Sequence, residues 1–364
     1  MLPGEYFTAA DIWRLEQTRI FHKHWLLAGH VSALPVAGDY LTLDVVGSSV
    51  IVVRGATGEF ASELYAYHNF CRHRGTRLCN ERQGTFGTAI HCPYHAWTYA
   101  LDGTLRAAPH MREVAGFDPA QWGLKRVALE VWHGFVFVNL AANPLPFAEA
   151  LPPLDGREGK FERWPLAKLR MAHQTVCDIN ANWKLLFHNY SECYHCPRAH
   201  PQLNQLTPFR NAENDFTEGA VLGGPMGMVN PQGSMTTHGE RCAPPFATLN
   251  TDDRGRVYYY TLFPSAFLSL HPDYVLLHRI EPLDIGRTRV ICTWYFHNEA
   301  VAAPNFNPQP AIDFWDTTNR QDWALCENAQ AGMRSTAWEP GPYSELESQL
   351  AEFDRHYLRV LHQP

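Results

Sequence analysis

The spacing of apolar residues along the chain changes near residue 39, and this change separates two kinds of predicted structure. Before it, a capping-box start at residues 8–11 opens a segment with apolar residues at helical spacing. These residues are Ile12, Leu15, Ile20, Phe21 and Trp25. After it, short apolar runs alternate with glycine-containing turns, which is typical of strands. The runs cover residues 40–46, 50–54, 64–69, 127–132 and 135–140, and they predict a small all-β domain.

The second half of the chain alternates between strand and helix patterns. Strands are predicted at residues 171–180, 257–263, 274–280 and 287–296. Helices are predicted at residues 182–196, 311–333 and 344–361. Residues 211–250 are rich in Gly, Pro, Met and Asn with little periodicity, so they predict either a functional lid or a poorly ordered stretch. A curved antiparallel sheet wrapped round a long helix fits this order of elements.

Length and composition set the organisation of the chain. Its 364 residues suffice for two domains, and the proline-rich stretches at 143–146 and 151–153 predict the linker between them. We therefore expect an N-terminal helical segment (1–38) packing on the second domain, a β domain (39–143) and a second domain (144–364). The net charge of −7 without a basic stripe excludes nucleic acid as a partner.

The compartment is predicted from what the sequence lacks. No charged segment followed by an apolar run opens the chain, and no stretch approaches the ~20 apolar residues of a membrane span. The nine cysteines do not resemble a disulfide framework. These features predict a cytoplasmic protein without membrane association.

Two short motifs between residues 71 and 95 each offer one thiolate and one imidazole. Cys71 and His73 lie in the first motif, and Cys92 and His95 lie in the second. Two Cys and two His in this order suit a [2Fe–2S] cluster with one iron held by sulfur and the other by nitrogen. A structural zinc site is the alternative, but zinc motifs usually pair Cys with Cys and His with His. Cys79, between the motifs, is either a spare ligand or a small buried residue.

A second constellation contains His195 and His200. Two His and one carboxylate on one face of Fe(II) leave positions open for O₂ and substrate. The two histidines are five residues apart, which a regular α-helix does not place on one face, so Pro197 is expected to break the helix and bring them together. The alternative is a pair of surface histidines at a frayed helix end. Cys193 and Cys196 have the C-x-x-C spacing of redox or zinc motifs, but we expect them to be packing residues.

The third ligand must come from another element, and the predicted helix at 311–333 offers one. Its inward stripe at helical spacing consists of Ile312, Trp315, Asn319, Asp322, Cys326 and Ala329. Asp322 is the only carboxylate of this stripe. Asp316 is explained by pairing with Arg320 one turn on, and Glu327 by a solvated face. Because a bare inward carboxylate is costly, Asp322 is predicted to bind the metal.

The residues around both constellations resemble a known family. The motifs Cys71-Arg72-His73-Arg74-Gly75 and Cys92-Pro93-Tyr94-His95-Ala96-Trp97 resemble the cluster loops of Rieske proteins. The segments Asn182-Trp183-Lys184, Asn189-Tyr190-Ser191-Glu192-Cys193-Tyr194-His195-Cys196, His200-Pro201 and Gln321-Asp322-Trp323 resemble the catalytic signature of Rieske non-haem iron oxygenase α subunits. The resemblance implies an α+β chain with an all-β Rieske domain and a helix-grip (START-like) catalytic domain.

The resemblance also implies the ligands of two cofactors, one [2Fe–2S] Rieske cluster and one mononuclear Fe(II). The cluster ligands would be Cys71 and Cys92 on one iron, and His73 and His95 on the other. The mononuclear iron would be bound by His195, His200 and Asp322. Glu192 would bridge, across a subunit boundary, to a cluster histidine of the neighbouring chain in a homotrimer.

A subgroup of the family is suggested by the acid at position 192. Many aromatic-ring members have Asp there, whereas Glu192 resembles the subgroup that acts on quaternary ammonium compounds such as glycine betaine, carnitine and choline. The run Ser234-Met235-Thr236-Thr237-His238-Gly239 is also similar to that subgroup. His188 departs from the pattern, because an acid is expected there.

These features predict the terminal oxygenase component of an O₂-dependent enzyme. Electrons would arrive from NAD(P)H through a separate flavin and iron–sulfur reductase or a ferredoxin. Hydroxylation of an N-methyl group would give a carbinolamine that collapses to formaldehyde and the demethylated amine. A cationic substrate favours aromatic faces, for which the candidates are Tyr190, Tyr259, Phe263 and Trp338.

Three other functions fit parts of the pattern. An aromatic-ring hydroxylating monooxygenase or dioxygenase would use the same metals with an apolar pocket. A non-catalytic Rieske electron carrier would have no use for His195, His200 and Asp322. A zinc-stabilised binding module would contain no iron.

Overall fold

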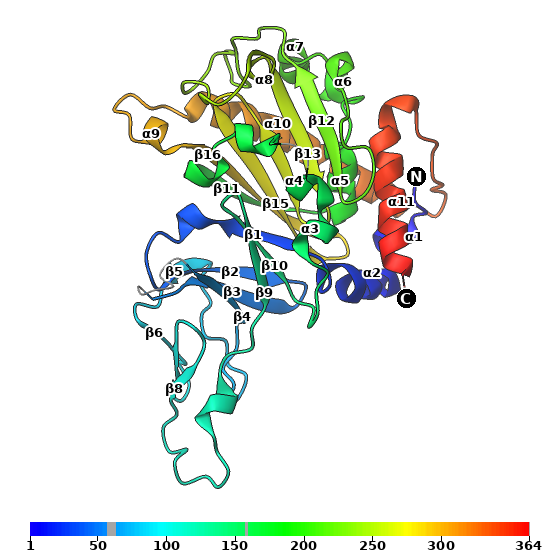
Figure 1. Cartoon of the computed structure of the whole chain (residues 1–364). Coiled ribbons are helices and arrows are strands. Elements are labelled where there is room, and N and C mark those ends of the chain that lie inside the picture. The colour runs from blue at the N-terminus through cyan, green and yellow to red at the C-terminus, as the bar shows by residue number, and fades with distance from the viewer. Residues whose placement is uncertain (57–62, 157–158, 364) are drawn as a thin grey trace. The chain divides into compact units, whose positions relative to one another are not determined.

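The computed structural model describes residues 1–56, 63–156 and 159–363. The chain forms two compact units (Figure 1), one of His22–Leu145 and one of Met1–Phe21 with Pro146–Pro364. Residues 22–38, which were expected to belong to the N-terminal helical segment, lie in the first of these units. The reason is that Leu26–His30 (β1) is a strand, paired antiparallel with Phe135–Asn139 (β10).

The unit of residues 22–145 is built from three small antiparallel sheets. They have the strand orders β1-β10-β9, β4-β3-β2-β5 and β6-β7-β8. The remaining bounds are β2 Asp39–Val45, β3 Ser48–Arg54, β4 Leu64–His68, β5 Gln83–Thr85, β6 Ala89–His91, β7 Thr98–Ala100, β8 Leu105–Ala107 and β9 Ala128–Trp132. Aromatic residues fill its core beside two of the motif cysteines, Cys71 and Cys92. The predicted all-β domain is confirmed.

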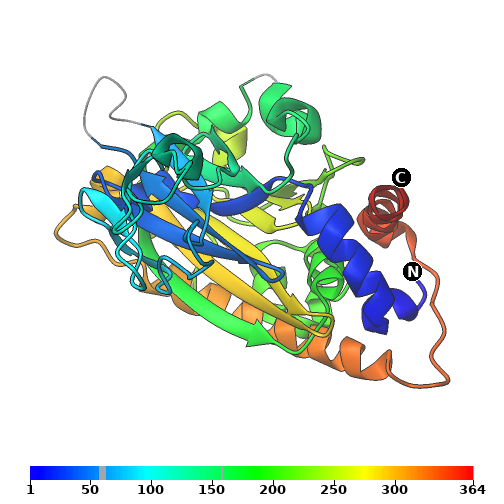
Figure 2. The same ribbon diagram turned by 90° about the horizontal axis from the view of Figure 1, so that it is seen from below.

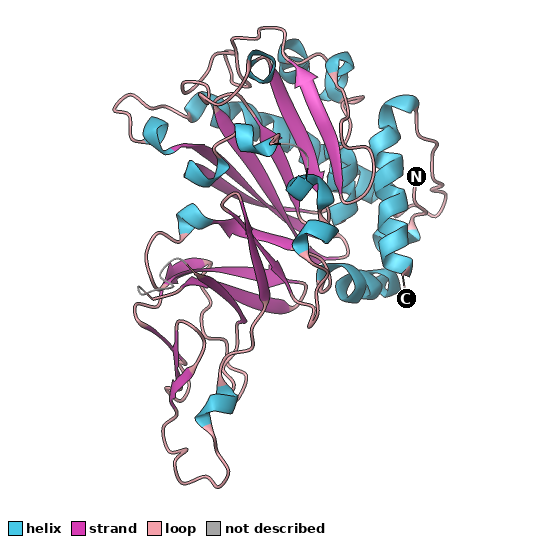
Figure 3. Cartoon of the chain, viewed as in Figure 1, coloured by secondary structure: helices cyan, strands magenta, loops and turns pink. Residues whose placement is uncertain are grey.

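The other unit is a six-stranded antiparallel sheet with helices (Figure 3). Its strand order is β11-β16-β15-β14-β13-β12. The bounds are β11 Leu169–Ile179, β12 Val221–Gly227, β13 Arg256–Leu262, β14 Ala266–Leu270, β15 Tyr274–Asp284 and β16 Arg287–His297. The long helix α10, Gln309–Gly332, runs along one face of this sheet (Figures 1 and 2). The predicted sheet around a long helix is confirmed.

The longest of the other helices in the described part of this unit are α2 Ala10–Glu16, α5 Trp183–Tyr190 and α11 Ser348–His362. The helix α5 lies beside α10, because Cys326 Sγ of α10 is 3.5 Å from Leu185 O of α5. In the described part of the chain, no helix combines the length and the apolar character that crossing a lipid bilayer requires.

The stretch at 211–250 contains a strand that sequence patterns did not predict. The strand β12 reads Val-Leu-Gly-Gly-Pro-Met-Gly, which has neither alternation nor β-branched enrichment. Its glycines allow close approach of the chain, because a Cβ at Gly224 would lie 2.2 Å from Glu213 O. Residues 212–216 therefore lie directly against β12, where Glu213 N donates to Pro225 O at 2.9 Å.

A buried ion pair ties the N-terminal helix to α5 and α11. Glu16 and Lys184 are both 0% exposed and are joined through Glu16 Oε1 and Lys184 Nζ. Glu16 also accepts hydrogen bonds from Tyr357 Oη at 2.6 Å and Trp183 Nε1 at 3.0 Å. Burial lowers the pKa of Lys184, and the negative charge of Glu16 opposes this shift.

We expect Glu16→Ala to lower the free energy of unfolding by about 3–5 kcal/mol, because it leaves a buried ammonium without its counter-charge. Urea denaturation measures the change. Glu5→Ala, at an exposed position of the same N-terminal segment, is the control and should stay within about 0.5 kcal/mol of wild type. A similar small effect of Glu16→Ala would show that the pair is not needed for stability.

Candidate active site and cluster site

The two loops that carry the predicted cluster ligands follow the same backbone path. The matching bonds run from Cys71 N to Thr76 O (2.8 Å), Gly75 N to Cys71 O (3.0 Å), Cys92 N to Trp97 O (2.8 Å) and Ala96 N to Cys92 O (3.2 Å). Gly75 and Ala96 have φ of 76° and 57°, so each loop passes through a left-handed residue four positions after its cysteine. The two loops therefore share a backbone turn, in which the imidazole follows two residues after Cys71 in the first loop and three residues after Cys92 in the second.

Among the four predicted cluster ligands, the two imidazoles each have a ring nitrogen without a hydrogen-bond partner among the described residues. Cys71 and Cys92 are 1% and 4% exposed. The rings of His73 and His95 meet edge to face at 4.8 Å, and Nδ1 of each is buried without a hydrogen-bond partner among the described residues. Trp97 stacks on the ring of His73 at 4.9 Å. Buried nitrogens rarely lack partners, so two side by side fit a site in which a metal is the partner.

Cys79, the spare cysteine of the spacer, is held by the side chain of Asn69. Its N–H donates to Asn69 Oδ1 at 3.2 Å, and Asn69 Nδ2 donates to Cys79 O at 2.7 Å. Burial raises the pKa of the Cys79 thiol to about 12. These bonds hold Cys79 as a half-buried residue packed against the core of this unit, as expected for a packing residue.

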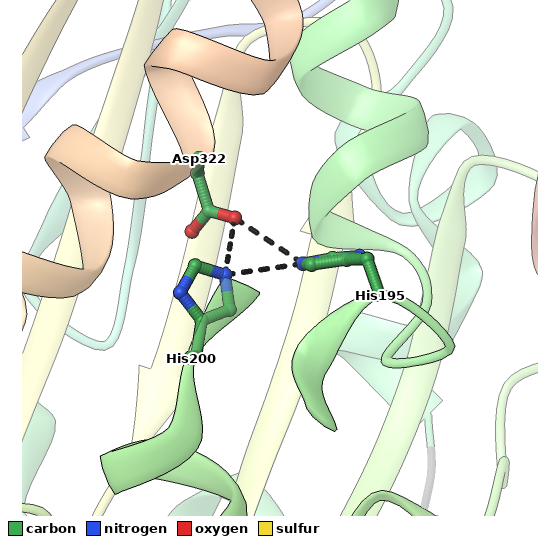
Figure 4. Close-up of side chains that lie close together, drawn as sticks. All are labelled: His195, His200 and Asp322. Carbon is green, nitrogen blue, oxygen red and sulfur yellow. Dashed lines mark hydrogen bonds and ion pairs between the residues drawn. The ribbon is translucent and has the colours of Figure 1, made fainter. Parts of the chain in front are cut away.

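The second site brings together His195, His200 and Asp322 (Figure 4). The two Nε2 atoms are 3.2 Å apart, and Asp322 Oδ1 lies 2.7 Å from His200 Nε2 and 3.2 Å from His195 Nε2. One ligand atom from each residue lies within 4.8 Å of the others. Two imidazole nitrogens and one carboxylate oxygen that converge in this way form the donor set of a non-haem iron(II) site.

The other ring nitrogens of both histidines are held by acceptors. His195 Nδ1 lies 2.6 Å from Glu192 Oε1, and His200 Nδ1 lies 2.7 Å from Gln321 Oε1. Each of these oxygens accepts a hydrogen bond from Nδ1–H, which fixes the orientation of the ring and directs Nε2 towards the centre. With Asp322 Oδ1 close to both Nε2 atoms, the three groups need a proton or a cation between them, and a metal ion fits this requirement.

The charges of the site support one another. Burial opposes protonation of His195, but hydrogen bonds to Asp322 and Glu192 raise its pKa to about 9. Burial acts against the charge on Asp322 as well, yet the bonds from His195 and His200 lower its pKa. The site thus favours an anionic carboxylate beside positive charge, which a metal cation supplies.

The chain reaches this geometry by a path different from the predicted one. The predicted helix at 182–196 ends at Tyr190, and Pro197 lies in the first turn of a new short helix, α6 Cys196–Ala199, where proline is tolerated. The break falls at His200, with φ −128° and ψ 66°. Pro201 follows it, and proline disfavours the helical conformation of the residue before it. The following proline, rather than Pro197, therefore turns His200 towards His195.

The helix α10 supplies Asp322 as predicted, although its side chain is 21% exposed rather than buried in the core. The two acids that were set aside have other partners. Asp316 pairs with Arg320 at 2.9 Å, as predicted. Glu327 is not simply solvated, because its Oε1 accepts bonds from Asn180 N at 2.9 Å and Asn180 Nδ2 at 3.0 Å.

Cys193 and Cys196 are not simple packing residues as expected, because they are joined by a disulfide bond. The C-x-x-C spacing allows it, with a Cα–Cα distance of 4.9 Å. Both residues line the cavity of the second site.

His188, the other unexpected residue of this region, pairs with Asp354 of α11 at 2.7 Å, so it has a structural partner outside the cavity lining.

A cavity of about 110 Å³ opens beside His195, His200 and Asp322. Its walls come from α5, β12, β13, α10 and the stretch 212–214, so part of the predicted lid region does border the site. Three aromatic side chains line it: Tyr190, Tyr259 and Trp315. Tyr259 meets Tyr190 at 6.2 Å and Trp315 at 6.1 Å, both edge to face.

Two of the four predicted aromatic candidates line this cavity and two do not. Tyr190 and Tyr259 do. Phe263 instead packs against Trp183 and Phe353 in the core, because β13 ends before it. Trp338 packs against Gly4 instead, and a Cβ at residue 4 would lie 3.1 Å from Trp338 Cε3.

Several lining residues were missed by sequence analysis. Trp315 had a signal, because it lies two helical turns before Asp322 on the same stripe of α10. Glu213, Asn214 and Gln349 had none, since they come from an irregular stretch and from the last helix.

A Rieske domain joined to a catalytic domain that binds mononuclear iron defines the class of Rieske non-haem iron oxygenases. Residues 24–118 match the family of the Rieske [2Fe–2S] domain, and residues 166–363 match the catalytic domain of the ring hydroxylating alpha subunit. The chain belongs to this family of oxygenase α subunits, with a [2Fe–2S] cluster and mononuclear iron as its cofactors. The electron-carrier and zinc-module alternatives are therefore wrong.

The relatives of this chain share a common chemistry. It is 31% identical to the glycine betaine monooxygenase oxygenase subunit of Pseudomonas aeruginosa (strain UCBPP-PA14), covering 94% of this chain and 85% of that protein. It is 37% identical to the carnitine monooxygenase oxygenase subunit of Escherichia coli (strain K12), covering 93% and 85%. A crystal structure of the quaternary ammonium Rieske monooxygenase CntA with its substrate L-carnitine is 25% identical, with a TM-score of 0.77 over 99% of this chain and 95% of that one.

Proposed function

We propose that this chain catalyses the oxidative N-demethylation of a quaternary ammonium compound. The observation that carries the proposal is the lining of the cavity. The aromatic residues Tyr190, Tyr259 and Trp315 and the acids Glu192 and Glu213 all line it, and no lysine or arginine does so in the described part of the chain. A cation is stabilised by aromatic faces and nearby carboxylates, whereas a neutral aromatic ring gains nothing from the acids.

We assign metal-binding roles to seven residues and a supporting role to an eighth. Cys71, Cys92, His73 and His95 would hold the cluster, and His195, His200 and Asp322 would hold the mononuclear iron, with Glu192 as the hydrogen-bond partner of His195. When bound, the cluster supplies single electrons and the mononuclear iron activates O₂. The supporting geometry is the orphaned pair of Nδ1 atoms at the first site and the converging donors at the second.

The remaining residues of the cavity position the substrate. The aromatic faces hold the methylated nitrogen, and the amide side chains of Asn214 and Gln349 offer hydrogen bonds to a polar arm. Residues 212–214 and β12 form the wall that excludes water. Hydroxylation of one N-methyl group then gives a carbinolamine, which releases formaldehyde without further catalysis.

The electron partners and the assembly follow from the family. A separate reductase or ferredoxin supplies electrons, as in other members of this family. We further propose a homotrimer in which Glu192 connects His195 to a cluster histidine of a neighbouring chain. A cytoplasmic location stays a prediction, and it is supported by the five cysteines that are neither in the disulfide nor assigned to the cluster, because all five are free thiols.

The test is product analysis with a surrogate reductase. We expect glycine betaine, carnitine or choline to give one formaldehyde per O₂ consumed. The matched control is 3,3-dimethyl-1-butanol, which has the shape of choline without its charge. It should bind at least about tenfold more weakly, since a desolvated cation–π contact contributes up to about 2 kcal/mol. A dihydrodiol or phenol from an aromatic compound, with no formaldehyde from any ammonium compound, would favour the ring-hydroxylating alternative.

A further inference from the structure

A second, smaller cavity lies behind Asp322. Its volume is about 30 Å³, and it is enclosed by α5, α10 and strands β14 to β16. Asn189, Tyr190 and Asp322 line both this cavity and the larger one, so the two are neighbours on either side of these residues. A cavity needs roughly 10–15 Å³ to hold one water molecule, so this cavity has room for one or two.

One wall of this rear cavity carries a buried imidazole with a free acceptor. His278 is 4% exposed and its Nε2 lies 3.1 Å from Asn319 Oδ1. Asn319 uses its Nδ2 to reach Cys292 Sγ at 3.5 Å, so its oxygen is the acceptor for His278 Nε2–H. His278 Nδ1 therefore bears a lone pair, and it has no partner among the described residues. Burial lowers the pKa of His278 to about 4, although Asn319 and Asp322 oppose the shift, so the ring is neutral.

Two more polar groups border the same space. The side chain of Asn189 has no hydrogen bond to any described residue, and neither has the second oxygen of Asp322, Oδ2, since Asp322 Oδ1 makes both contacts to the histidines. A buried water typically makes two to four hydrogen bonds, and His278, Asn189 and Asp322 provide three partners. Tyr190 and Asn319 also line the space, but their polar groups already bond to Ser269 and to His278 and Cys292. Leu186, Phe267 and Cys326 add apolar surface.

We propose that the rear cavity binds one or two water molecules that deliver protons to the substrate cavity. The inference rests on the proposed function. N-Methyl hydroxylation joins R–CH₃, O₂, two electrons and two protons to give R–CH₂OH and H₂O, so two protons must reach the substrate cavity in each turnover. The electrons come from the reductase. Water held at His278 Nδ1 passes a proton on along Asn189 and Asp322 and takes up another from bulk water, so the water is unchanged after each turnover.

The structural test is a high-resolution crystal structure of the iron-loaded protein. We expect an ordered water within hydrogen-bond distance of His278 Nδ1. An empty rear cavity would overturn the proposal.

The kinetic test uses two variants that disturb the water in different ways. His278→Leu removes the acceptor, and Cys326→Leu fills the cavity without removing a polar partner of the water. Both should lower kcat by roughly 100-fold, the usual contribution of a positioned proton donor, with KM for the ammonium substrate and bound iron unchanged. Both should also enlarge the solvent deuterium isotope effect on kcat.

The control is His22→Leu. Nε2 of His22 also lacks a partner among the described residues, and His22 lines neither cavity. Its kcat and isotope effect should stay close to wild type. If His278→Leu and Cys326→Leu also keep the wild-type kcat, the rear water does not supply protons. Absence of formaldehyde from every ammonium compound would refute the proposed function alone, and the crystal structure would still decide whether the water site exists.

Discussion

Asp322→Ala is expected to lose the mononuclear iron and all turnover while the visible spectrum of the [2Fe–2S] cluster stays unchanged. Asp322 contributes the negative charge among the three converging donors, and without it two neutral imidazoles must hold a divalent cation alone. Loss of a residue behind a metal ligand costs about 10–100-fold in affinity or activity, so loss of the ligand itself should cost more. Iron analysis and formaldehyde formation measure the two effects.

The control for Asp322→Ala lies on the same helix. Asp316 pairs with Arg320 and lines neither cavity. The Asp316→Ala protein should therefore keep both its mononuclear iron and its turnover. An Asp322→Ala protein that retains one mononuclear iron per chain would show that another residue provides the third ligand.

Glu192→Gln is expected to slow electron transfer between the two metal centres by about 10–100-fold while both metals remain bound. The Glu192 carboxylate accepts a hydrogen bond from His195 Nδ1–H at 2.6 Å. Its negative charge raises the pKa of His195 and so favours a positive charge or a metal ion on that ring. Glutamine keeps the shape but loses the charge, both towards His195 and towards the proposed histidine of the neighbouring chain. Rapid mixing of pre-reduced protein with O₂ and substrate follows cluster re-oxidation directly.

The control for Glu192→Gln is Glu299→Gln. Its side chain is 87% exposed and it lines neither cavity, so re-oxidation should proceed at the wild-type rate. Unchanged re-oxidation in Glu192→Gln would contradict the proposed role of this acid as the connection between centres.

The parts of both sites that depend on local sequence could be predicted. The two cluster loops are five- and six-residue motifs, and their shared turn needs only residues next to each cysteine. Asp322 was found because helical periodicity places it on one stripe with Trp315, and the structure keeps that stripe against the cavity.

The parts that depend on distant contacts could not be predicted. Gly224 weakens a strand pattern, and β12 forms there because it pairs along its length with β13, while Gly224 leaves room for residue 213 on its other side. Gln349 reaches the cavity from the last helix, α11. Residue spacing near the active site does not predict that this helix lies beside the cavity. Pro197 was expected to break a helix, but proline is also tolerated in the first turn of a helix. The chain begins the new helix α6 there, so Pro197 interrupts nothing.

The junction of Glu16, Lys184 and Tyr357 has a consequence for biosynthesis. Tyr357 leaves the ribosome last of the three, 341 residues after Glu16. The unit of His22–Leu145 is continuous in sequence and is complete long before then, so it can fold while translation continues. The first 21 residues must instead wait for the end of the chain. A nascent polypeptide released before α11 would thus carry a finished electron-accepting module attached to an unfinished catalytic one.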